Sequence, residues 1–313
     1  MDTKVSNDNI ALLRSNMEKR IVGKSGLIDR LIIALISEGH VLLEDVPGVG
    51  KTSLAKALAD SLSLSFSRIQ CTPDTMPSDI TGVSVYNSKS GSFEVVPGPV
   101  VNNIVLADEL NRTTPKTQSA LLEAMEENKV TIDGKDLALP EPFMVIGTQN
   151  PLETAGTYPL PEAQLDRFMM KLSVGYPGTE DALDMAGRFL EGSLHEETKA
   201  VLKGEDILKM RSDVREVKIN DKLIDYAVTI VESTRSVPEI SCGASPRALL
   251  SMLRCAQAYA LFSARDYCVP EDILNAAELT LPHRLILTAQ ARMNHVSQAQ
   301  VLKTLTNHIK VPS

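Results

Sequence analysis

The segment Val41–Thr52 contains the residue types that bind phosphate. It reads VLLEDVPGVGKT, so a short apolar run leads into a glycine-rich loop, and a lysine and a threonine follow where a helix should begin. Backbone N–H groups of such a loop point at phosphate oxygens, the lysine bridges the β- and γ-phosphates, and the threonine hydroxyl binds Mg²⁺. We therefore expect nucleotide contacts from Pro47, Gly48, Val49, Gly50, Lys51, Thr52 and Ser53, and metal binding from Thr52.

One position departs from the usual phosphate-loop pattern. The first glycine of the consensus G-x-x-x-x-G-K-[ST] is replaced by Asp45 in this chain. Aspartate adopts unusual backbone angles more readily than most residues, so the turn is expected to form. The carboxylate of Asp45 must then point away from the phosphates, while Gly48 and Gly50 keep the positions of closest approach small.

A second apolar run, Ile104–Ala107, ends in Asp108 and Glu109. Ligands of parallel sheets bind beyond the carboxyl ends of the strands, so both acids are expected at that edge. Asp108 would hold Mg²⁺, directly or through water, and Glu109 would orient and deprotonate the attacking water. Taken alone, an acid pair at a strand end is equally well explained by loop solvation. Its position after the phosphate loop favours nucleotide hydrolysis.

A third apolar run, Phe143–Gly147, ends in Thr148, Gln149 and Asn150. An amide there could hydrogen-bond the γ-phosphate or the attacking water, although Asn-Pro is also a common start of a turn. Arg167 lies at the start of a fifth apolar run. This sequence pattern alone does not separate a catalytic role for these residues from an ordinary structural one.

Arg247 lies in the first turn of a helix that we expect to begin at Ser245-Pro246, with the serine as N-cap. Fixed guanidinium groups such as those of Arg167 and Arg247 suit phosphate recognition. Most arginines are solvated surface groups, so neither one would be singled out without the phosphate loop.

Five short apolar runs carry these residues, and helical patterns lie between most of them. Short runs of branched and large apolar residues, bounded by polar or Gly/Pro residues, are typical of buried parallel strands. Their alternation with helices predicts a three-layer α/β domain. The runs are Val41–Leu43, Phe66–Ile69, Ile104–Ala107, Phe143–Gly147 and Phe168–Val174, and two of the helices are Lys51–Ser61 and Lys116–Asn128.

Two stretches interrupt this alternation and are expected to form hairpins. In Thr81–Val96, GVSVY and SFEVV flank the turn-rich NSKSG, and in Lys129–Leu139 the pair Asp133-Gly134 is a strong two-residue turn. Each could be a surface hairpin without a role.

After Tyr176-Pro177-Gly178 helical periodicity continues to the end of the chain. Asp221–Arg235 is amphipathic, and Pro270 opens a further helix. We therefore divide the chain into an α/β core over residues 1–177 and an all-helical lid over 178–313.

Composition limits the classes of partner. The chain has 313 residues, enough for about two domains, and its formal net charge is −8. A general affinity for nucleic acid or anionic lipid is therefore unexpected. With no tryptophan, six phenylalanines and six tyrosines, platforms that stack single-stranded bases are also unexpected.

The four cysteines and the N-terminus bear on location. Cys71, Cys242, Cys255 and Cys268 form no C-x-x-C pair, so we expect buried or half-buried free thiols in a reducing compartment. The N-terminus MDTKVSNDNI lacks the apolar stretch of a signal peptide, and no apolar run approaches the length of a membrane span. We expect a soluble, cytoplasmic chain.

Taken together, these strings resemble the AAA+ ATPases and, within them, the MoxR family. The resemblance extends from about Ile21 to the C-terminus. It rests on LLEDVPGVGKT, TPDTMPSDITG, VVPGPV, IVLADELNRTTPKTQSALLEAMEE, GTQNP, TYPLPEAQLDRF and GASPRA. Within this family the aspartate at position 45 looks like a usual feature.

The resemblance implies a P-loop NTPase core with an α-helical lid. The two hairpins would be the helix-2 insert and the pre-sensor-1 hairpin, which usually face a pore or a partner. Asn150 matches sensor 1 and Arg247 matches sensor 2. Arg167 matches the arginine finger, which acts on the nucleotide of the neighbouring subunit. Val22 and Gly23 match the segment that meets adenine.

The resemblance also implies ATP and Mg²⁺ as cofactors, a homo-hexameric ring, and chaperone-like remodelling or activation of protein clients. Such clients include metal-cofactor enzymes and proteins with von Willebrand factor A domains. Two alternatives remain open. A nucleotide-gated binding module with little turnover fits less well, because Asp108 and Glu109 are both present. A DNA- or transcription-directed AAA+ machine lacks support from a GAFTGA-like loop, a helix-turn-helix tail or a net basic charge.

Overall fold

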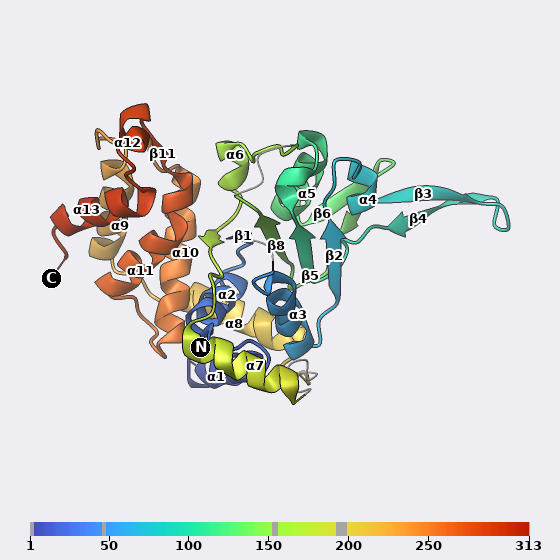
Figure 1. The fold of residues 1–313 in the computed structure, drawn as a ribbon, viewed down its shortest axis with the longest axis horizontal. Helices are drawn as coiled ribbons and strands as arrows, with labels where there is room; N and C mark the ends of the chain where they lie inside the picture. The colour runs from blue at the N-terminus through green and yellow to red at the C-terminus, as the bar shows by residue number, and fades with distance from the viewer. Residues whose placement is uncertain (1–2, 46–47, 152–155, 192–198, 313) are drawn as a thin grey trace.

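A parallel sheet of five strands forms the centre of the molecule (Figure 1). The computed structural model describes residues 3–45, 48–151, 156–191 and 199–312. The strand order is β2-β5-β8-β1-β9, and the five strands coincide with the five predicted apolar runs. The strands are β1 (Val41–Glu44), β2 (Phe66–Gln70), β5 (Ile104–Asp108), β8 (Met144–Gln149) and β9 (Met170–Leu172).

Alternate residues of the strands face opposite sides of the sheet. In β1, Val41 and Leu43 join one hydrophobic cluster and Leu42 joins the other. β5 alternates in the same way, with Leu106 on the first side and Val105 on the second. Both faces of the sheet are therefore buried, which explains why the strands read as continuous apolar runs.

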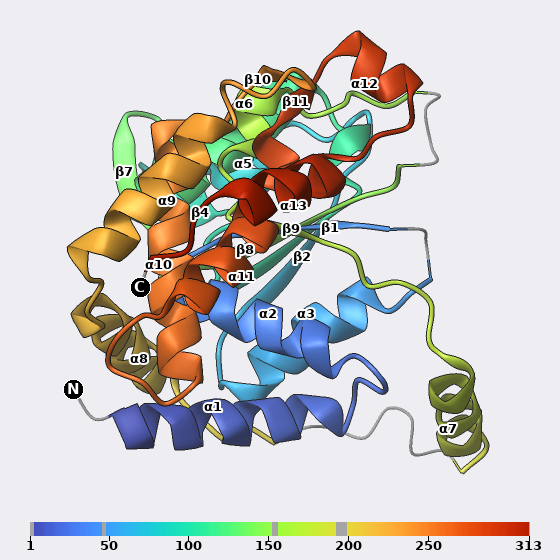
Figure 2. The ribbon, with the colours of Figure 1, turned by 90° about the vertical axis from the view of Figure 1, so that its left-hand side faces the viewer.

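Helices cover both faces, so the prediction of a three-layer α/β core is confirmed. Figure 2 shows α1, α2 and α3 stacked on one side of the sheet, and α5 covers the other side together with the β6–β7 hairpin. The helices of this part are α1 (Thr3–Glu18), α2 (Ser25–Ile36), α3 (Lys51–Ser61), α4 (Pro77–Thr81), η1 (Leu110–Arg112), α5 (Pro115–Glu127) and α6 (Glu162–Leu165).

Both predicted hairpins form. β3 (Gly82–Asn87) and β4 (Ser92–Pro97) pair antiparallel and project from the core on the side away from the lid (Figure 1). On this hairpin Tyr86 and Phe93 meet edge to face, with ring centroids 5.4 Å apart, and both remain exposed.

The second hairpin is compact. β6 (Lys129–Ile132) and β7 (Lys135–Ala138) are joined by the predicted two-residue turn. Asp133 and Gly134 both have positive φ, 48° and 75°. A type I′ turn needs positive φ at both central residues, which explains the choice of Asp-Gly.

The C-terminal part is helical as predicted, with one correction. β10 (Ile240–Cys242) and β11 (Ile286–Leu287) form a short antiparallel pair, so the lid is not all-helical. Strands of two or three residues are too short to show a period-two pattern in the sequence. The helices are α7 (Thr179–Leu190), α8 (Gly204–Glu216), α9 (Asp221–Ser233), α10 (Pro246–Phe262), α11 (Pro270–Thr280), η2 (Pro282–Arg284), α12 (Ala289–Met293) and α13 (Gln298–His308).

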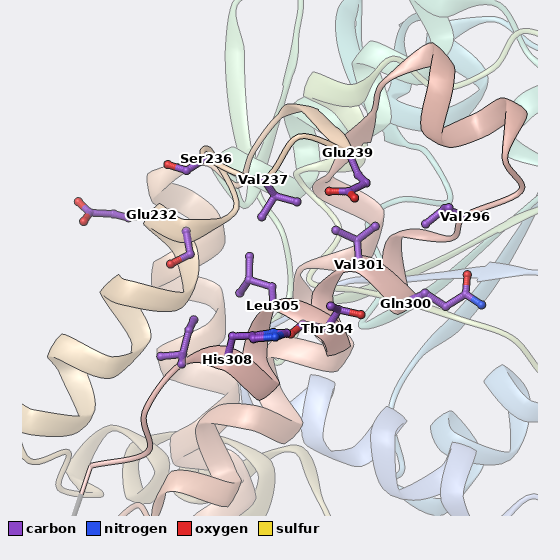
Figure 3. A pocket seen from close by; sticks show the side chains of 12 residues that line it. Glu232, Ser236, Val237, Glu239, Val296, Gln300, Val301, Thr304, Leu305 and His308 are labelled. Atoms are coloured by element: carbon purple, nitrogen blue, oxygen red, sulfur yellow. The ribbon is translucent and has the colours of Figure 1, made fainter.

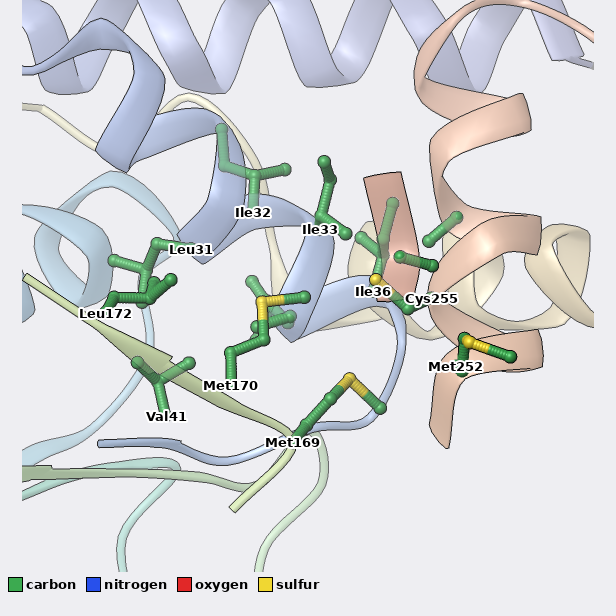
Figure 4. Close-up of a cluster of buried hydrophobic side chains, with 14 of the residues drawn as sticks. Leu31, Ile32, Ile33, Ile36, Val41, Met169, Met170, Leu172, Met252 and Cys255 are labelled. Carbon is green, nitrogen blue, oxygen red and sulfur yellow. The ribbon is translucent and has the colours of Figure 1, made fainter. Parts of the chain in front are cut away.

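The lid packs on the β9 edge of the sheet. Figure 4 shows side chains of α2, β1 and β9 continuing into Met252 and Cys255 of α10, and all belong to one hydrophobic cluster. α11 also packs against β9. This continuous apolar contact fixes where the lid meets the sheet, and β9 is the strand that follows Arg167.

Three of the four cysteines are buried, as predicted, but Cys242 is exposed. The prediction of a buried or half-buried thiol is therefore wrong at Cys242, because it lies in the short β10 strand on the lid surface. Within the described residues, no helix is both long and apolar enough to cross a membrane.

Candidate active site

The glycine-rich loop connects β1 to α3 and presents open backbone. Gly48 and Gly50 have φ of 86° and 91°, in the left-handed region that favours glycine. Gly50 is the N-cap of α3, so the N–H groups of the first helical turn, from Lys51 to Ser53, begin beside the loop. Among the described residues, chain neighbours aside, no group lies within 4 Å of a Cβ built at either glycine, which leaves room for close approach by a ligand. Pro47 lies outside the described residues.

Lys51 begins α3 and is almost fully buried. Its Nζ donates a hydrogen bond to the main-chain oxygen of Asp45, 2.7 Å away. Burial lowers the pKa of Lys51, and the charges of Asp108, Asp45 and Glu109 act in the opposite direction. Phosphate bound at the loop would compensate this partly desolvated cation.

Asp45 directs its carboxylate toward the chain after β9. Its Oδ2 accepts hydrogen bonds from Ser173 Oγ at 2.8 Å and from the backbone N–H of Gly175 at 2.6 Å. The aspartate thus anchors the loop to the neighbouring strand, in keeping with the expectation that its carboxylate does not face the phosphates.

Asp108 ends β5, Glu109 follows it, and Thr148 of β8 bridges them. The Thr148 hydroxyl donates to Asp108 Oδ1 at 2.6 Å and accepts from the Glu109 backbone N–H at 2.9 Å. Thr148 is fully buried. Because Glu109 also has a positive φ of 57°, this bridge fixes an unusual backbone conformation at the predicted base.

Side chains of β2 and η1 hold the two carboxylates. Arg68 Nη2 lies 2.6 Å from Asp108 Oδ2. Glu109 Oε2 accepts from Gln70 Nε2 at 3.1 Å and from Arg112 Nη1 at 3.2 Å. A cation or a water molecule that binds these acids therefore shares the carboxylates with these polar partners.

Asn150 follows β8 directly, so it lies at the same edge of the sheet as Asp108 on the adjacent strand. The residue is buried, and its main-chain oxygen accepts a hydrogen bond of 3.3 Å from Asn111 Nδ2. Its neighbour Gln149 instead donates to Glu44 Oε1 at 2.5 Å. Of the two amides, Asn150 remains the candidate that the sequence indicated.

A cavity of about 370 Å³ adjoins the glycine-rich loop. Of the nine predicted nucleotide contacts, five described residues line this cavity: Val22, Gly48, Val49, Gly50 and Ser53. Gly23 lies between the lining residues Val22 and Lys24 but does not itself line the cavity. It has a φ of 68°, and a Cβ at this position would lie 2.0 Å from Asp181 Cγ. The cavity walls are mostly apolar, and they also include Ile21, Leu27, Leu54, Val174, Tyr176, Pro177 and Met185.

The two predicted arginines lie together, apart from this cavity. Arg167 Nε is 2.9 Å from Glu126 Oε2, and Arg247 pairs with the other oxygen of the same carboxylate. Hydrogen bonds from Arg247 and Arg167 lower the pKa of Glu126. These residues line a cavity of about 250 Å³ that shares no lining residue with the cavity at the loop. We call Glu126, Arg167, Arg247 and Arg284 the arginine cluster.

Arg167 does not begin a strand. The prediction placed it directly before a strand at Phe168, but β9 starts at Met170, and Arg167 lies in the turn after α6. Arg247 lies in the first turn of α10, as predicted, and the Ser245 hydroxyl caps this helix by accepting from Ala248 N at 3.1 Å.

A larger cavity of about 690 Å³ lies in the lid between α9 and α13. Figure 3 shows Val237, Val301 and Leu305 beside Glu232 and Glu239 at this site. It shares no lining residue with the loop or with the arginine cluster, so we assign it no part in phosphate chemistry.

Comparison with known proteins agrees with this geometry. Residues 40–170 match the ATPase family associated with various cellular activities (AAA), and residues 232–305 match the AAA lid domain. The chain is 48% identical to the uncharacterized protein YeaC of Bacillus subtilis over 95% of this chain and 93% of that protein. It is 40% identical to Chaperone MoxR1 of Mycobacterium tuberculosis over 95% of this chain and 80% of the relative. The chain belongs to the MoxR family of AAA+ ATPases.

A solved structure supports the assignment of this MoxR-family chain. A crystal structure from Cytophaga hutchinsonii, described there as a "putative ATPase", superposes with a TM-score of 0.93 at 39% identity. The match covers 100% of this chain and 97% of that one. Both the P-loop AAA+ fold and the helical lid are thereby established for the MoxR-family chain.

Sequence reasoning missed several polar residues of the MoxR-family site. Arg68 and Gln70 have the period-two spacing that places them on one face of β2, and Gln70 pairs in register with Asp108. That spacing could have indicated them. Glu126 and Arg284 carry no such local signal, because they reach the arginines only through tertiary contacts.

Proposed function

We propose that this chain is a Mg²⁺-dependent ATPase whose subunits complete one another's active sites. One observation carries the proposal. Arg167 and Arg247 share a single carboxylate in a cavity separate from the phosphate-loop cavity of the same subunit. Arginines placed there suit the nucleotide of an adjacent subunit better than that of their own.

The residues at the sheet edge have suitable roles in ATP hydrolysis. The loop N–H groups and Lys51 would bind the phosphates, and Val22 and Gly23 would lie near the adenine of the nucleotide. Thr52 and Asp108 offer hydroxyl and carboxylate oxygens, which are the ligands Mg²⁺ prefers. Bound Mg²⁺ would neutralise charge on the β- and γ-phosphates.

Glu109 is our candidate base, and its backbone is already fixed through Thr148. It would accept a proton from the attacking water, which Asn150 would help to orient. Arg167 from the neighbouring subunit would stabilise the charge that develops on the γ-phosphate oxygens, and Arg247 would contact the same phosphates.

At the level of the assembly we propose a homo-hexameric ring that remodels or activates protein clients, including metal-cofactor enzymes or proteins with von Willebrand factor A domains. The name of the relative Chaperone MoxR1 and the exposed β3–β4 hairpin support a role on proteins. We assign residues 1–177 to the core and 178–313 to the lid. Four unpaired cysteines support a reducing, cytoplasmic location.

A second candidate is a nucleotide-gated binding module with little turnover. The observation that favours it is the engagement of Glu109 Oε2 by both Gln70 and Arg112, which occupies one of the two carboxylate oxygens of the candidate base. A turnover assay on the assembled protein separates the two functions, since a gated module would bind ATP and release almost no phosphate.

The test of the proposed function is Arg167→Ala. We expect the ATPase rate to fall by about 10³-fold, the lower end of the range for arginine fingers, with ATP affinity retained. Phosphate release and calorimetric ATP titration measure the two quantities. Arg292→Ala, at an exposed position of α12, is the matched control and should keep the wild-type rate. Wild-type turnover by an Arg167→Ala protein, or by a verified monomer, would contradict the proposal.

A further inference from the structure

Arg284 is a buried cation of the lid that contacts the chain around Arg167. It ends η2 and is only 7% exposed. Its Nη2 donates to the main-chain oxygens of Asp166 at 3.0 Å and Phe168 at 3.1 Å, and its Nε lies 2.8 Å from Asp166 Oδ1. The guanidinium thus contacts the residues on both sides of Arg167.

Other lid residues hold the same three-residue stretch. The Ser245 hydroxyl donates to Asp166 Oδ2 at 3.1 Å, and His283 Nε2 lies 2.9 Å from the main-chain oxygen of Phe168. The Phe168 side chain is fully buried. Arg167 therefore emerges from a segment that is fixed on each side and held from the lid.

Burial of an arginine is costly unless its charge and donors are matched. Here Asp166 matches the charge, and Thr280 O and Ser251 Oγ accept at 3.0 and 3.2 Å. Burial lowers the pKa of Arg284 to about 10, so it stays charged at neutral pH. The planar guanidinium presents its donors in a rigid fork, a fixed geometry that the ammonium of a lysine on its flexible stem does not reproduce.

We propose that Arg284 is a positioning residue that sets the orientation of Arg167 and couples it to the lid. The inference rests on the proposed function, in which Arg167 serves the adjacent subunit. A displacement of η2 relative to β9 would move the main chain at 166–168 and with it the guanidinium of Arg167. Glu126 lies on α5 of the core and reaches the lid through Arg247, so it connects only the side chain of Arg167 to the lid. The contacts of Arg284 are made to the main chain that carries Arg167.

The experiment mixes two defective subunits. Arg284→Met keeps its own Glu109 and phosphate loop but loses the support of Arg167. Glu109→Gln keeps Arg167 but lacks the base. We expect Arg284→Met alone to lose about 10- to 100-fold in kcat with KM unchanged, as misplacement by about 1 Å does. Mixed with Glu109→Gln it should regain activity above the sum of the two separate proteins.

Arg167→Ala mixed with Glu109→Gln is the reference, and Arg292→Met is the matched control with wild-type kinetics. If the Arg167→Ala mixture regains activity and the Arg284→Met mixture does not, the role of Arg284 is overturned while the proposed function stands. If the Arg167→Ala mixture fails, the trans arrangement fails, and the inference about Arg284 fails with it.

Two further variants test the proposal if Arg284→Met does not fold. Asp166→Asn keeps the size of the partner and weakens the ion pair, and it should give a smaller kcat loss that the same mixing reverses. Arg284→Lys keeps the charge without the fork and should lose kcat as well. Full activity of Arg284→Lys or of Asp166→Asn would show that the contacts around Arg167 do not set its orientation.

Discussion

The edge of the sheet at the phosphate loop, which we call the phosphate-loop edge, and the arginine cluster position their charged side chains in different ways. At the edge, Asp108 ends β5, Glu109 follows it, and Lys51 begins α3 after the glycine-rich loop, so the backbone of one sheet and its loop positions them. In the cluster, Glu126, Arg167 and Arg247 come from α5, the turn before β9 and α10, and side-chain contacts between these elements hold them.

The difference bears on how each region works. The edge is organised by contacts within one subunit. Two arginines of the cluster are partly exposed, Arg247 at 44% and Arg167 at 30% side-chain exposure, and both pair with Glu126. We infer that the edge binds nucleotide in the single subunit and that the cluster acts only after assembly.

The largest expected effect is at the edge. Glu109→Gln removes the candidate base but keeps its size, so turnover should fall by about 10²- to 10⁴-fold while ATP binding is retained. Phosphate release under saturating ATP and a binding titration measure these. The control is Glu239→Gln, because Glu239 lines the lid cavity and does not line the cavity at the loop. Hydrolysis at the wild-type rate would show that another residue is the base.

The second prediction concerns the folding stability at mildly acidic pH and a histidine beside the arginine cluster. His40 lines the cluster cavity, and burial lowers its pKa to about 4. Its Nδ1 accepts from the Val145 backbone N–H at 2.9 Å, which a protonated ring cannot do. The unfolded chain takes up this proton near pH 6.5, whereas the folded chain does so near pH 4. Stability is therefore present above pH 6.5 and is lost as the pH falls toward 4.

Urea unfolding at pH 7.5, 6.5, 5.5 and 4.5 measures this loss, with a slope of at most about 1.4 kcal/mol per pH unit for each such histidine. His283 contributes in the same direction, because burial lowers its pKa to about 3. His40→Gln should be less stable at pH 7.5 but should show a shallower slope. His295→Gln, at an exposed position, should keep the wild-type slope. Equal slopes for wild type and His40→Gln would contradict the assignment.

The smallest effect is expected from Glu126→Gln. Glu126 and its two arginines are partly exposed, so the ion pairs are screened and their loss should cost under about 1 kcal/mol of stability. Thermal unfolding in low and high salt measures this cost. Glu123→Gln, at an exposed position of the same helix, is the control. A loss of several kcal/mol would mean that the two ion pairs of Glu126 are a major source of the stability of the fold.

The sequence predicts these two regions to different extents. The phosphate loop, the five strands and both hairpins depend on local patterns of apolar residues, glycines and turn pairs, and all were predictable. Arg167 and Arg247 could be named from motifs, but their common partner Glu126 is 41 residues away from one and 121 from the other. Contacts between distant elements leave no periodic signal, so Arg284 was not predictable either. The β10–β11 pair was missed because its strands are too short.

One further consequence comes from the cysteines. Burial raises the pKa of Cys71 and Cys268 to about 12 and also raises that of Cys255, whereas Cys242 is exposed on the lid. Maleimides react with accessible thiolates, so a dye would attach selectively at Cys242 in the unmodified chain. This position is five residues before Arg247. A fluorophore there would report lid movement during the nucleotide cycle without any engineered cysteine.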